Sequence, residues 1–263
     1  MIQNENDLDP LLKLSLQDFS YSRINTFSEC ELRYFYSYVL KEPQDYGNPA
    51  LLGNIIHKAL EITLEDGEKI SLKELLDNYR ASVEDKDPEN NIPDFMLSDG
   101  EEMLRQFVDS SPEEISLYAK ELPFSFVLGP ARFNGFIDLV SVYPTRVFIR
   151  DYKSGKQEVA YKNIQTNLQM GIYSLYMKSL FPEKEIYAEL YYLRSGKAKG
   201  HLFTDDDLLQ VENILLDKVS EIVVKENFVA TPNERACRWC SYAKNGVCPT
   251  GQLRLRRQNL LID

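Results

Sequence analysis

Hydrophobic residues in the first part of the chain recur every three or four positions, the spacing of helices with one buried face. Ser22 can cap the first of these helices, and Pro49 and Gly67 mark the start and the end of the second. The predicted helices cover residues 22–38, about 49–65, 71–85 and 93–110. Acidic residues are dense in the later helices, which indicates a solvated acidic surface there.

From Phe124 onward the pattern changes to short segments rich in Phe, Val and Ile that alternate with polar residues, as strands do. Strands are predicted over residues 124–129, 131–142 and 145–153, a helix over 167–180, a strand pair over 185–196 and 197–204, and a long helix over 205–226. This order predicts an α/β fold, with a mixed central sheet and helices against its faces. No internal repeat or low-complexity linker divides the sequence, so we expect a single unit over residues 1–263.

The overall charge and composition narrow the class of protein. The formal net charge is −11, which argues against a broadly basic nucleic-acid-binding surface, although a local cleft can differ from the whole. Lysines gather between Lys153 and Lys199, and arginines in the tail at Arg254, Arg256 and Arg257. No stretch reaches the ~20 apolar residues of a membrane span. The acidic first residues lack the pattern of a signal peptide, so a cytoplasmic location is expected.

Two carboxylates and a lysine fall on neighbouring predicted strands. Asp138 ends the segment FNGFID, and Asp151 and Lys153 end the next segment, VFIRDYK. Side chains two residues apart on a strand share a face, so these three groups can meet at one edge of the sheet. Carboxylates bind hard cations such as Mg²⁺, and a lysine can stabilise negative charge that develops on a phosphate. Alone, a D-x-K triplet could equally be a surface ion pair.

Three further residues can support such a site. His57 lies on the second predicted helix, where it could be a metal ligand or a core histidine. Glu61, four residues later, could orient the imidazole or be a surface charge. Gln169 and Tyr173 are also four residues apart on a predicted helix, so their side chains face the same way.

The four cysteines form a second group, with one near the start of the chain and three near its end: Cys30, Cys237, Cys240 and Cys248. In a reducing compartment, cysteines are more often metal ligands or catalytic groups than disulfides. Four thiolates suit either a [4Fe–4S] cluster or a structural Zn²⁺ ion, and composition alone does not choose between them.

Taken in order, these motifs resemble those of PD-(D/E)XK nucleases of RecB/AddB type. The resemblance extends over residues from about 20 to 250 and rests on four short motifs: Gly53 to His57 (G-x-x-x-H), Gly135 to Asp138 (G-x-I-D), Asp151 to Lys156 (D-Y-K-S-G-K) and Gln169 to Tyr173 (Q-x-x-x-Y). It implies a restriction-endonuclease-like core, with a helical insertion at about 67–121 and a cluster-binding segment at about 230–250.

The resemblance also implies roles for the residues of these motifs. His57, Asp138, Asp151 and the backbone carbonyl of Tyr152 would bind Mg²⁺ or Mn²⁺, and Lys153 would be the catalytic lysine. Gln169 and Tyr173 would help to position DNA or the lysine.

By the same resemblance, the four cysteines would hold a [4Fe–4S] cluster that joins the two ends of the chain, which makes Zn²⁺ the less favoured metal. The chain departs from the family pattern at Glu31, where a proline often follows the first cysteine. It also has seven residues between Cys240 and Cys248, a longer gap than the family shows, with Lys-Asn-Gly as a turn within it.

The function implied is a metal-dependent DNA exonuclease acting on single strands or ends in repair or recombination. A CRISPR-adaptation nuclease that trims prespacers beside integrase partners shares every motif and is one alternative. A noncatalytic DNA-binding or scaffold protein is another. The sequence has no G-x-x-x-x-G-K-[ST] motif, so any helicase partner would be a separate protein.

Overall fold

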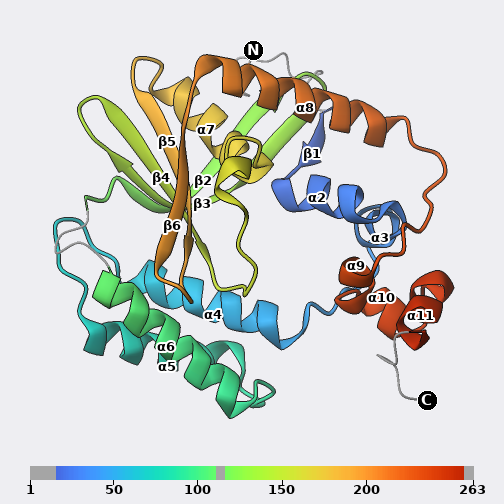
Figure 1. The fold of residues 1–263 in the computed structure, drawn as a ribbon, viewed down its shortest axis with the longest axis horizontal. Coiled ribbons are helices and arrows are strands. Elements are labelled where there is room, and N and C mark those ends of the chain that lie inside the picture. Colours follow the sequence, from blue (N-terminus) through green and yellow to red (C-terminus); the bar gives the residue numbers. More distant parts are fainter. Residues whose placement is uncertain (1–15, 111–115, 258–263) are drawn as a thin grey trace.

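A computed structural model describes residues 16–110 and 116–257 (Figure 1). The limits predicted for a single unit, residues 1 and 263, lie outside these ranges, as do the acidic first residues. Within the described ranges no helix is both long enough and apolar enough to cross a membrane.

A six-stranded mixed sheet forms the centre of the fold. Its strands are β1 (Gln17–Phe19), β2 (Ala119–Leu128), β3 (Ala131–Val142), β4 (Arg146–Lys153), β5 (Glu185–Tyr192) and β6 (Lys197–Phe203). The three predicted consecutive strands, β2, β3 and β4, form an antiparallel meander, β4 and β5 are parallel, and the predicted pair of β5 and β6 is antiparallel. The short β1 pairs in parallel with the start of β3.

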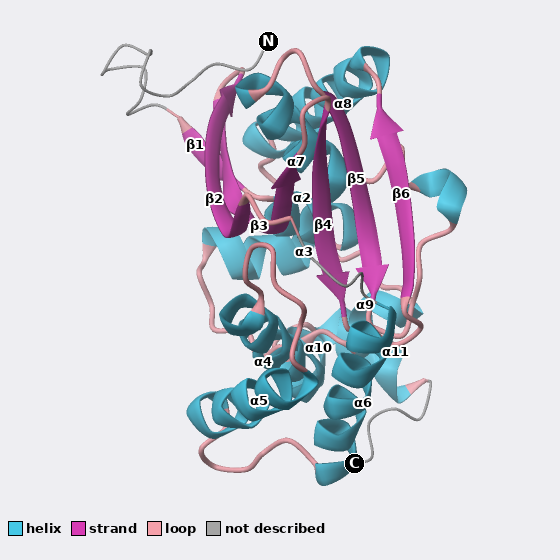
Figure 2. Ribbon diagram, turned by 90° about the vertical axis from the view of Figure 1, so that its left-hand side faces the viewer, coloured by secondary structure: helices cyan, strands magenta, loops and turns pink. Residues whose placement is uncertain are grey.

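Helices flank this sheet, as predicted, and lie behind it and below its lower end in the view of Figure 2. The helices of eight or more residues are α2 (Tyr21–Glu29), α4 (Gly47–Thr63), α5 (Leu72–Lys86), α6 (Asp94–Ser110), α7 (Leu168–Leu180), α8 (Asp205–Val223) and α11 (Pro249–Arg256). Helices α2, α7 and α8 and the sheet share one hydrophobic core. Helices α4, α5 and α6 form a second core, which includes Tyr152 and Tyr191 near the ends of β4 and β5. The sheet thus separates two cores.

The first predicted helix is interrupted, which corrects the sequence prediction. The cap is Ser20 rather than Ser22, because the Ser20 hydroxyl accepts a hydrogen bond from the amide of Arg23. Helix α2 ends at Glu29, and Cys30 has an extended backbone (φ −164°, ψ 113°). A new helix, α3 (Glu31–Tyr34), begins directly after it and continues as a wider π-helical turn over Phe35–Val39. Helical spacing does not reveal this break, because it depends on contacts with a distant segment.

That distant segment follows α8. The carboxylate of Glu31 accepts hydrogen bonds from Lys225 Nζ (2.7 Å) and the Val229 amide (3.2 Å), and the amide of Leu32 donates to the Val229 carbonyl (3.2 Å). The bonds bring the two ends of the described chain together, and Figure 1 shows α3 beside the loop that leads from α8 to α9 (Glu234–Arg238). The break in the helix therefore coincides with the docking of the C-terminal part.

Strand β2 begins at Ala119, five residues before the predicted start at Phe124. The last three residues of the helical insertion predicted over residues 67–121 therefore belong to the sheet. Pro123 obscured this start because proline is rare inside strands. It is accommodated here because β2 pairs only with β3 and so lies at an edge. Asp138 also lies within β3, four residues before its end, and not at a strand end as predicted.

Candidate functional site

His57 lies on α4, a helix of the second core, and its side chain contacts the sheet. The apolar side chains of α4 at Leu52, Ile55, Ile56, Ala59 and Leu60 are buried, as predicted, and hold the helix in place. A Cβ atom at Gly53 would lie 3.2 Å from Ser154 Oγ, so the glycine lets α4 approach the turn that follows Lys153. The glycine of the G-x-x-x-H motif thus has a structural role, because it allows close packing between α4 and the turn after Lys153.

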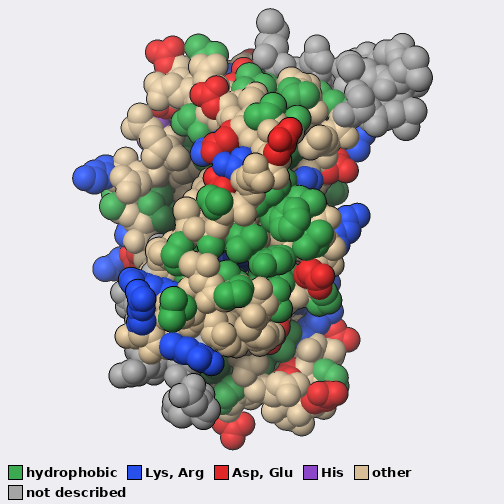
Figure 3. All heavy atoms as spheres, turned by 90° about the vertical axis from the view of Figure 1, so that its right-hand side faces the viewer, with side chains coloured by type: hydrophobic (Ala, Val, Ile, Leu, Met, Phe, Trp, Pro, Cys, Tyr) green, Lys and Arg blue, Asp and Glu red, His purple; other side chains and the backbone are tan. Residues whose placement is uncertain are grey.

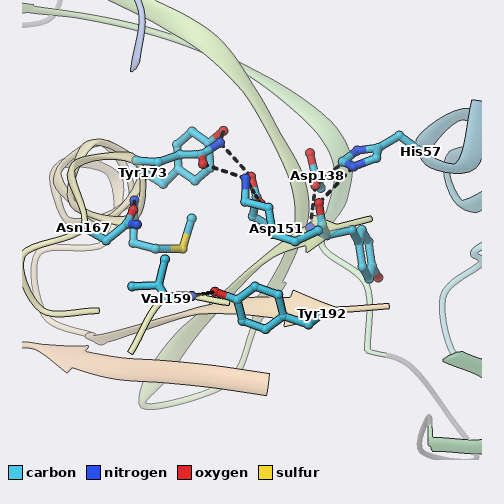
Figure 4. Close-up of polar contacts among 11 residues, drawn as sticks. His57, Asp138, Asp151, Val159, Asn167, Tyr173 and Tyr192 are labelled. Atoms are coloured by element: carbon cyan, nitrogen blue, oxygen red, sulfur yellow. Dashed lines mark hydrogen bonds and ion pairs between the residues drawn. The ribbon is translucent and has the colours of Figure 1, made fainter. Parts of the chain in front are cut away.

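Asp138, His57 and Tyr152 form the first cluster of the site (Figure 4). Asp138 Oδ2 accepts a hydrogen bond from the Tyr152 amide (2.8 Å) and lies 3.3 Å from His57 Nδ1. His57 Nε2 lies 2.9 Å from the Tyr152 carbonyl oxygen. The imidazole therefore bridges a side chain of β3 and the backbone of β4.

The same contacts set the protonation of His57. Burial lowers the pKa of the imidazole, but the hydrogen bond that His57 donates to Asp138 and the negative charges of Asp138 and Asp151 outweigh it, and the pKa of His57 is raised from 6.5 to about 9. At neutral pH the imidazole is therefore protonated, and each ring nitrogen can donate to the oxygen beside it.

Asp151, Lys153, Gln169 and Tyr173 form the second cluster. Lys153 Nζ lies 2.6 Å from Asp151 Oδ2 and donates to Gln169 Oε1 (2.8 Å). The Gln169 amide donates to Asp151 Oδ1 (2.7 Å) and to the Tyr173 hydroxyl (2.9 Å). Gln169 and Tyr173 indeed face one way on α7, which Asn167 caps by accepting from the Met170 amide (3.1 Å). The glutamine fixes both groups of the D-x-K triplet.

Asp151 is a buried carboxylate, only 2% exposed. Burial raises its pKa to about 6, although Lys153 opposes the shift. Burial lowers the pKa of Lys153, but the charge of Asp151 outweighs it and the net shift is upward. Asp151 Oδ2 accepts no well-aligned hydrogen bond despite its short distance to Lys153. Its cationic partner is the Lys153 ammonium group, and an ionised carboxylate oxygen can accept more than one such partner.

The two clusters are adjacent because of strand pairing. Leu139 of β3 pairs with Arg150 of β4, so Asp138 and Asp151 occupy the next position of this antiparallel ladder. The sequence-based expectation that the two carboxylates lie on neighbouring strands is therefore what the structure shows.

Glu121 of β2 joins this site and was not predicted. One oxygen of Glu121, one of Asp138 and a ring nitrogen of His57 lie within 4.8 Å of one another, the only such group of acidic, histidine or cysteine side chains among the described residues. Glu121 has φ 45°, a left-handed conformation that costs a non-glycine residue roughly 1–2 kcal/mol. Burial and the nearby Asp138 raise its pKa. An acidic residue on the strand next to Asp138 could have indicated a further ligand. Because the predicted start of β2 lay after Glu121, the sequence did not place this residue on a strand.

Two residues considered for the site lie apart from this compact group. Asp151 does not belong to the compact group of possible ligands, because its oxygens face Lys153 and Gln169. Glu61 pairs with Lys58 (2.9 Å), and the carboxylate that contacts His57 is Asp138. Glu61 is therefore a surface charge of α4 and not the group that orients the imidazole.

The four cysteines line a single pocket near the C-terminus, beside Arg33, Tyr36 and Tyr242. Between Cys240 and Cys248 the chain forms the short helix α10 (Ser241–Lys244) and a turn at Gly246 (φ 78°), so the longer gap still brings Cys248 to the pocket. In the described residues, however, no three cysteine sulfurs lie within 4.8 Å of one another. Burial raises the pKa of Cys237 and Cys240.

Side-chain contacts hold the pocket closed around these sulfurs. The Tyr242 hydroxyl donates to the Glu42 carbonyl (2.8 Å), and the Tyr36 hydroxyl donates to the Val247 carbonyl (3.2 Å). Hydrophobic side chains gather on this side of the molecule (Figure 3), and the exposed ones in its C-terminal segments include Val229, Trp239, Val247 and Leu253. Contacts between the N-terminal helices and the C-terminal segment thus accompany the gathering of the cysteines.

The model of the PD-(D/E)XK nuclease superfamily matches residues 18–249 of the chain. Among solved structures, a protein described as "Putative exonuclease" from Eubacterium rectale is similar, with a TM-score of 0.52 and 11% identity over 88% of this chain and 90% of that chain. SSO0001 gives a TM-score of 0.42 and 12% identity over 89% of this chain and 86% of that chain. No curated protein matches the sequence. The mixed, helix-flanked sheet is consistent with the restriction-endonuclease-like core that the motifs imply.

Proposed function

Because the chain belongs to the PD-(D/E)XK nuclease superfamily, we propose that it is a divalent-metal-dependent nuclease that hydrolyses phosphodiester bonds of DNA, at ends or in single strands. The observation that supports this proposal most directly is the convergence of His57, Glu121, Asp138 and the Asp151–Lys153 pair on one site. A scaffold protein would have no use for a buried carboxylate beside a lysine at the edge of a group of metal-binding side chains.

The donor set suits Mg²⁺ or Mn²⁺. Asp138, Glu121 and the Tyr152 carbonyl offer the oxygen ligands that hard cations prefer, and His57 adds a nitrogen that Mn²⁺ accepts readily. By the family resemblance Asp151, whose Oδ2 now pairs with Lys153, would be a further ligand. When bound, the ion supplies a Lewis acid and lowers the pKa of a bound water. Glu121 is thus added to the ligands that the family resemblance implies.

The chain's own groups would then orient and stabilise the reacting phosphate. Lys153 stays protonated beside Asp151, so its ammonium group can stabilise negative charge on the phosphate during attack. Gln169 accepts from Lys153 and donates to Asp151, and thereby holds both at a fixed separation. Tyr173, hydrogen-bonded to Gln169, keeps the amide in this orientation.

The [4Fe–4S] cluster is part of the same proposal. Four thiolates that line one pocket suit an iron–sulfur cluster, for which they are the usual ligands. Four thiolates are also usual ligands of a structural Zn²⁺ ion, and the family resemblance is what favours the iron–sulfur cluster. The cluster would add metal bonds to the contacts that already join the two ends.

The proposal is tested by incubating the purified protein with end-labelled single- and double-stranded DNA. We expect cleavage with Mg²⁺ or Mn²⁺ and none after EDTA treatment, because the carboxylates and His57 cannot polarise a phosphate without an ion between them. Restoring the metal should restore cleavage. Cleavage that persists in EDTA, or no cleavage with either metal on either DNA, would rule out the proposed activity.

His57 should make metal binding depend on pH. The imidazole must lose its proton to bind a metal, and its pKa is about 9, so Mg²⁺ affinity should rise about tenfold per pH unit up to that value. Without metal the sign is opposite: the stability that protonated His57 contributes is present below pH 6.5 and is lost as the pH rises through about 9. The Mg²⁺-induced increase in Tm, measured from pH 6.5 to 9.5, should therefore grow with pH.

The chain contains one other histidine, which provides a matched control. His201 Nε2 lies 2.9 Å from Asp207 Oδ2, so it too has a carboxylate partner. His57→Gln should remove the pH dependence of the Mg²⁺ effect, whereas His201→Gln should keep it. A Mg²⁺ effect in the unaltered protein that is the same at every pH would contradict the role of His57.

A further inference from the structure

The hollow beside the proposed metal ligands contains two lysines that the cleavage chemistry above does not use. It has a volume of about 370 Å³ and is open to solvent. One side of α4 lines it from Gly53 to Glu61 and includes Lys58, while Lys86 comes from the last residue of α5. Glu121 and Asp138 lie at its base. Two cations therefore share one hollow with the site where a phosphate would be cut.

The position of Lys86 is fixed by the turn that follows it. Asp87 is 2% exposed, and its carboxylate accepts hydrogen bonds from the amides of Asn91 and Ile92, both at 2.8 Å. The Asn48 side chain at the start of α4 donates to the Asn91 carbonyl (2.8 Å). This turn is thus bonded to α4, and Lys86 is held next to the helix that carries His57 and Lys58.

The present partners of both lysines are weakly bound. Lys58 pairs with Glu61 (2.9 Å) and Lys86 with Asp85 (3.1 Å), and each lysine side chain is more than 40% exposed. Exposed pairs of this kind contribute about 0–1 kcal/mol, so a phosphate could replace either carboxylate at little cost. A divalent ion would offset the charges of Glu121 and Asp138 and leave the hollow attractive to anions.

We propose that Lys58 and Lys86 bind the backbone phosphate next to the one that is cut, and that a DNA strand lies in this hollow, along α4 and past the end of α5. This inference rests on the proposed nuclease function and extends it to substrate positioning by the helical insertion. A lysine ammonium is a flexible point charge that recognises phosphate without reading the base. Binding at this position should consequently be independent of sequence.

The test measures the affinity of a fluorescein-labelled single-stranded oligonucleotide by anisotropy at several salt concentrations. Lys153→Met is used as the parent so that the strand remains intact. For single strands each phosphate contact contributes about 0.7 to the slope of log affinity against log salt. Lys86→Gln and Lys58→Gln should each lower the slope by about 0.7, equally for oligonucleotides of different sequence, while Lys86→Arg should retain the parental slope.

Lys73→Gln is the matched control, because Lys73 lies on the same helix as Lys86, is 89% exposed and pairs with Asp77 at 2.9 Å. It should leave the slope unchanged. A Lys86→Gln slope equal to that of Lys73→Gln would overturn the phosphate site, while cleavage by the unaltered protein would leave the nuclease function standing. Unaltered protein that neither binds nor cleaves DNA would overturn both.

Discussion

Replacing Lys153 with methionine is expected to reduce DNA cleavage by about 10²- to 10³-fold, the usual effect of removing a group that stabilises charge in the transition state. Methionine keeps much of the length and hydrophobic stem of lysine but loses the ammonium group. Lys153 Nζ contacts both Asp151 and Gln169, so the change also leaves those groups without their cation. Initial rates on end-labelled DNA with Mg²⁺ measure the effect.

A second lysine separates this effect from a general loss of charge. Lys178 lies on α7, with its Nζ 3.5 Å from Asp205 and donating to the Lys184 carbonyl (3.3 Å), at an end of the helix remote from Gln169. Lys178→Met should cleave at nearly the unaltered rate. Circular dichroism should show both variants folded. If Lys153→Met cleaves as fast as Lys178→Met, Lys153 has no role in the reaction.

Replacing Cys30 with serine should prevent binding of the proposed iron–sulfur cluster and lower the thermal stability of the protein. Cys30 is the one cysteine that the N-terminal helices contribute to the pocket, so losing its thiolate would free one side of the proposed cluster. The hydrogen bonds between Glu31 and the segment near Val229 would remain, and we expect the core around the sheet to stay folded. Iron and sulfide analysis of anaerobically purified protein, its visible spectrum and its Tm provide the measurements.

Ser28→Ala serves as the control, since Ser28 is an exposed residue of α2 two positions before Cys30. It should retain iron, colour and Tm. Stoichiometric zinc without iron in the unaltered protein would replace the cluster by a mononuclear site. A Cys30→Ser protein with full iron content and unchanged Tm would show that Cys30 is not a ligand.

The part of the site that could be predicted from the sequence depends on local rules. Alternation with a period of two identified β3 and β4, and the short link between them made the strands neighbours. Asp138 and Asp151 could therefore be placed together before any coordinates were known. The Gln169–Tyr173 pair followed from helical spacing in the same way. Each prediction needed only one regular element or one short connection.

The features that were missed depend on irregular backbone and distant contacts. Glu121 reaches the site from a left-handed position in a strand, a conformation that the residue type itself does not indicate. The break at Cys30 is accompanied by bonds to residues about two hundred positions away, such as that between Glu31 and Val229. Propensity describes a residue among its sequence neighbours, and both features arise where tertiary contacts override it.

The site is assembled from the two hydrophobic cores described above. His57 comes from α4, which packs in the core of α4, α5 and α6. Asp138 and Asp151 come from β3 and β4, whose hydrophobic side chains also pack against α2, α7 and α8. An ion held by both groups would act as a thermodynamic cross-link, because its binding free energy is lost when either core separates from the other. Cooperative unfolding of the two cores as one unit would then be a property that the metal concentration controls.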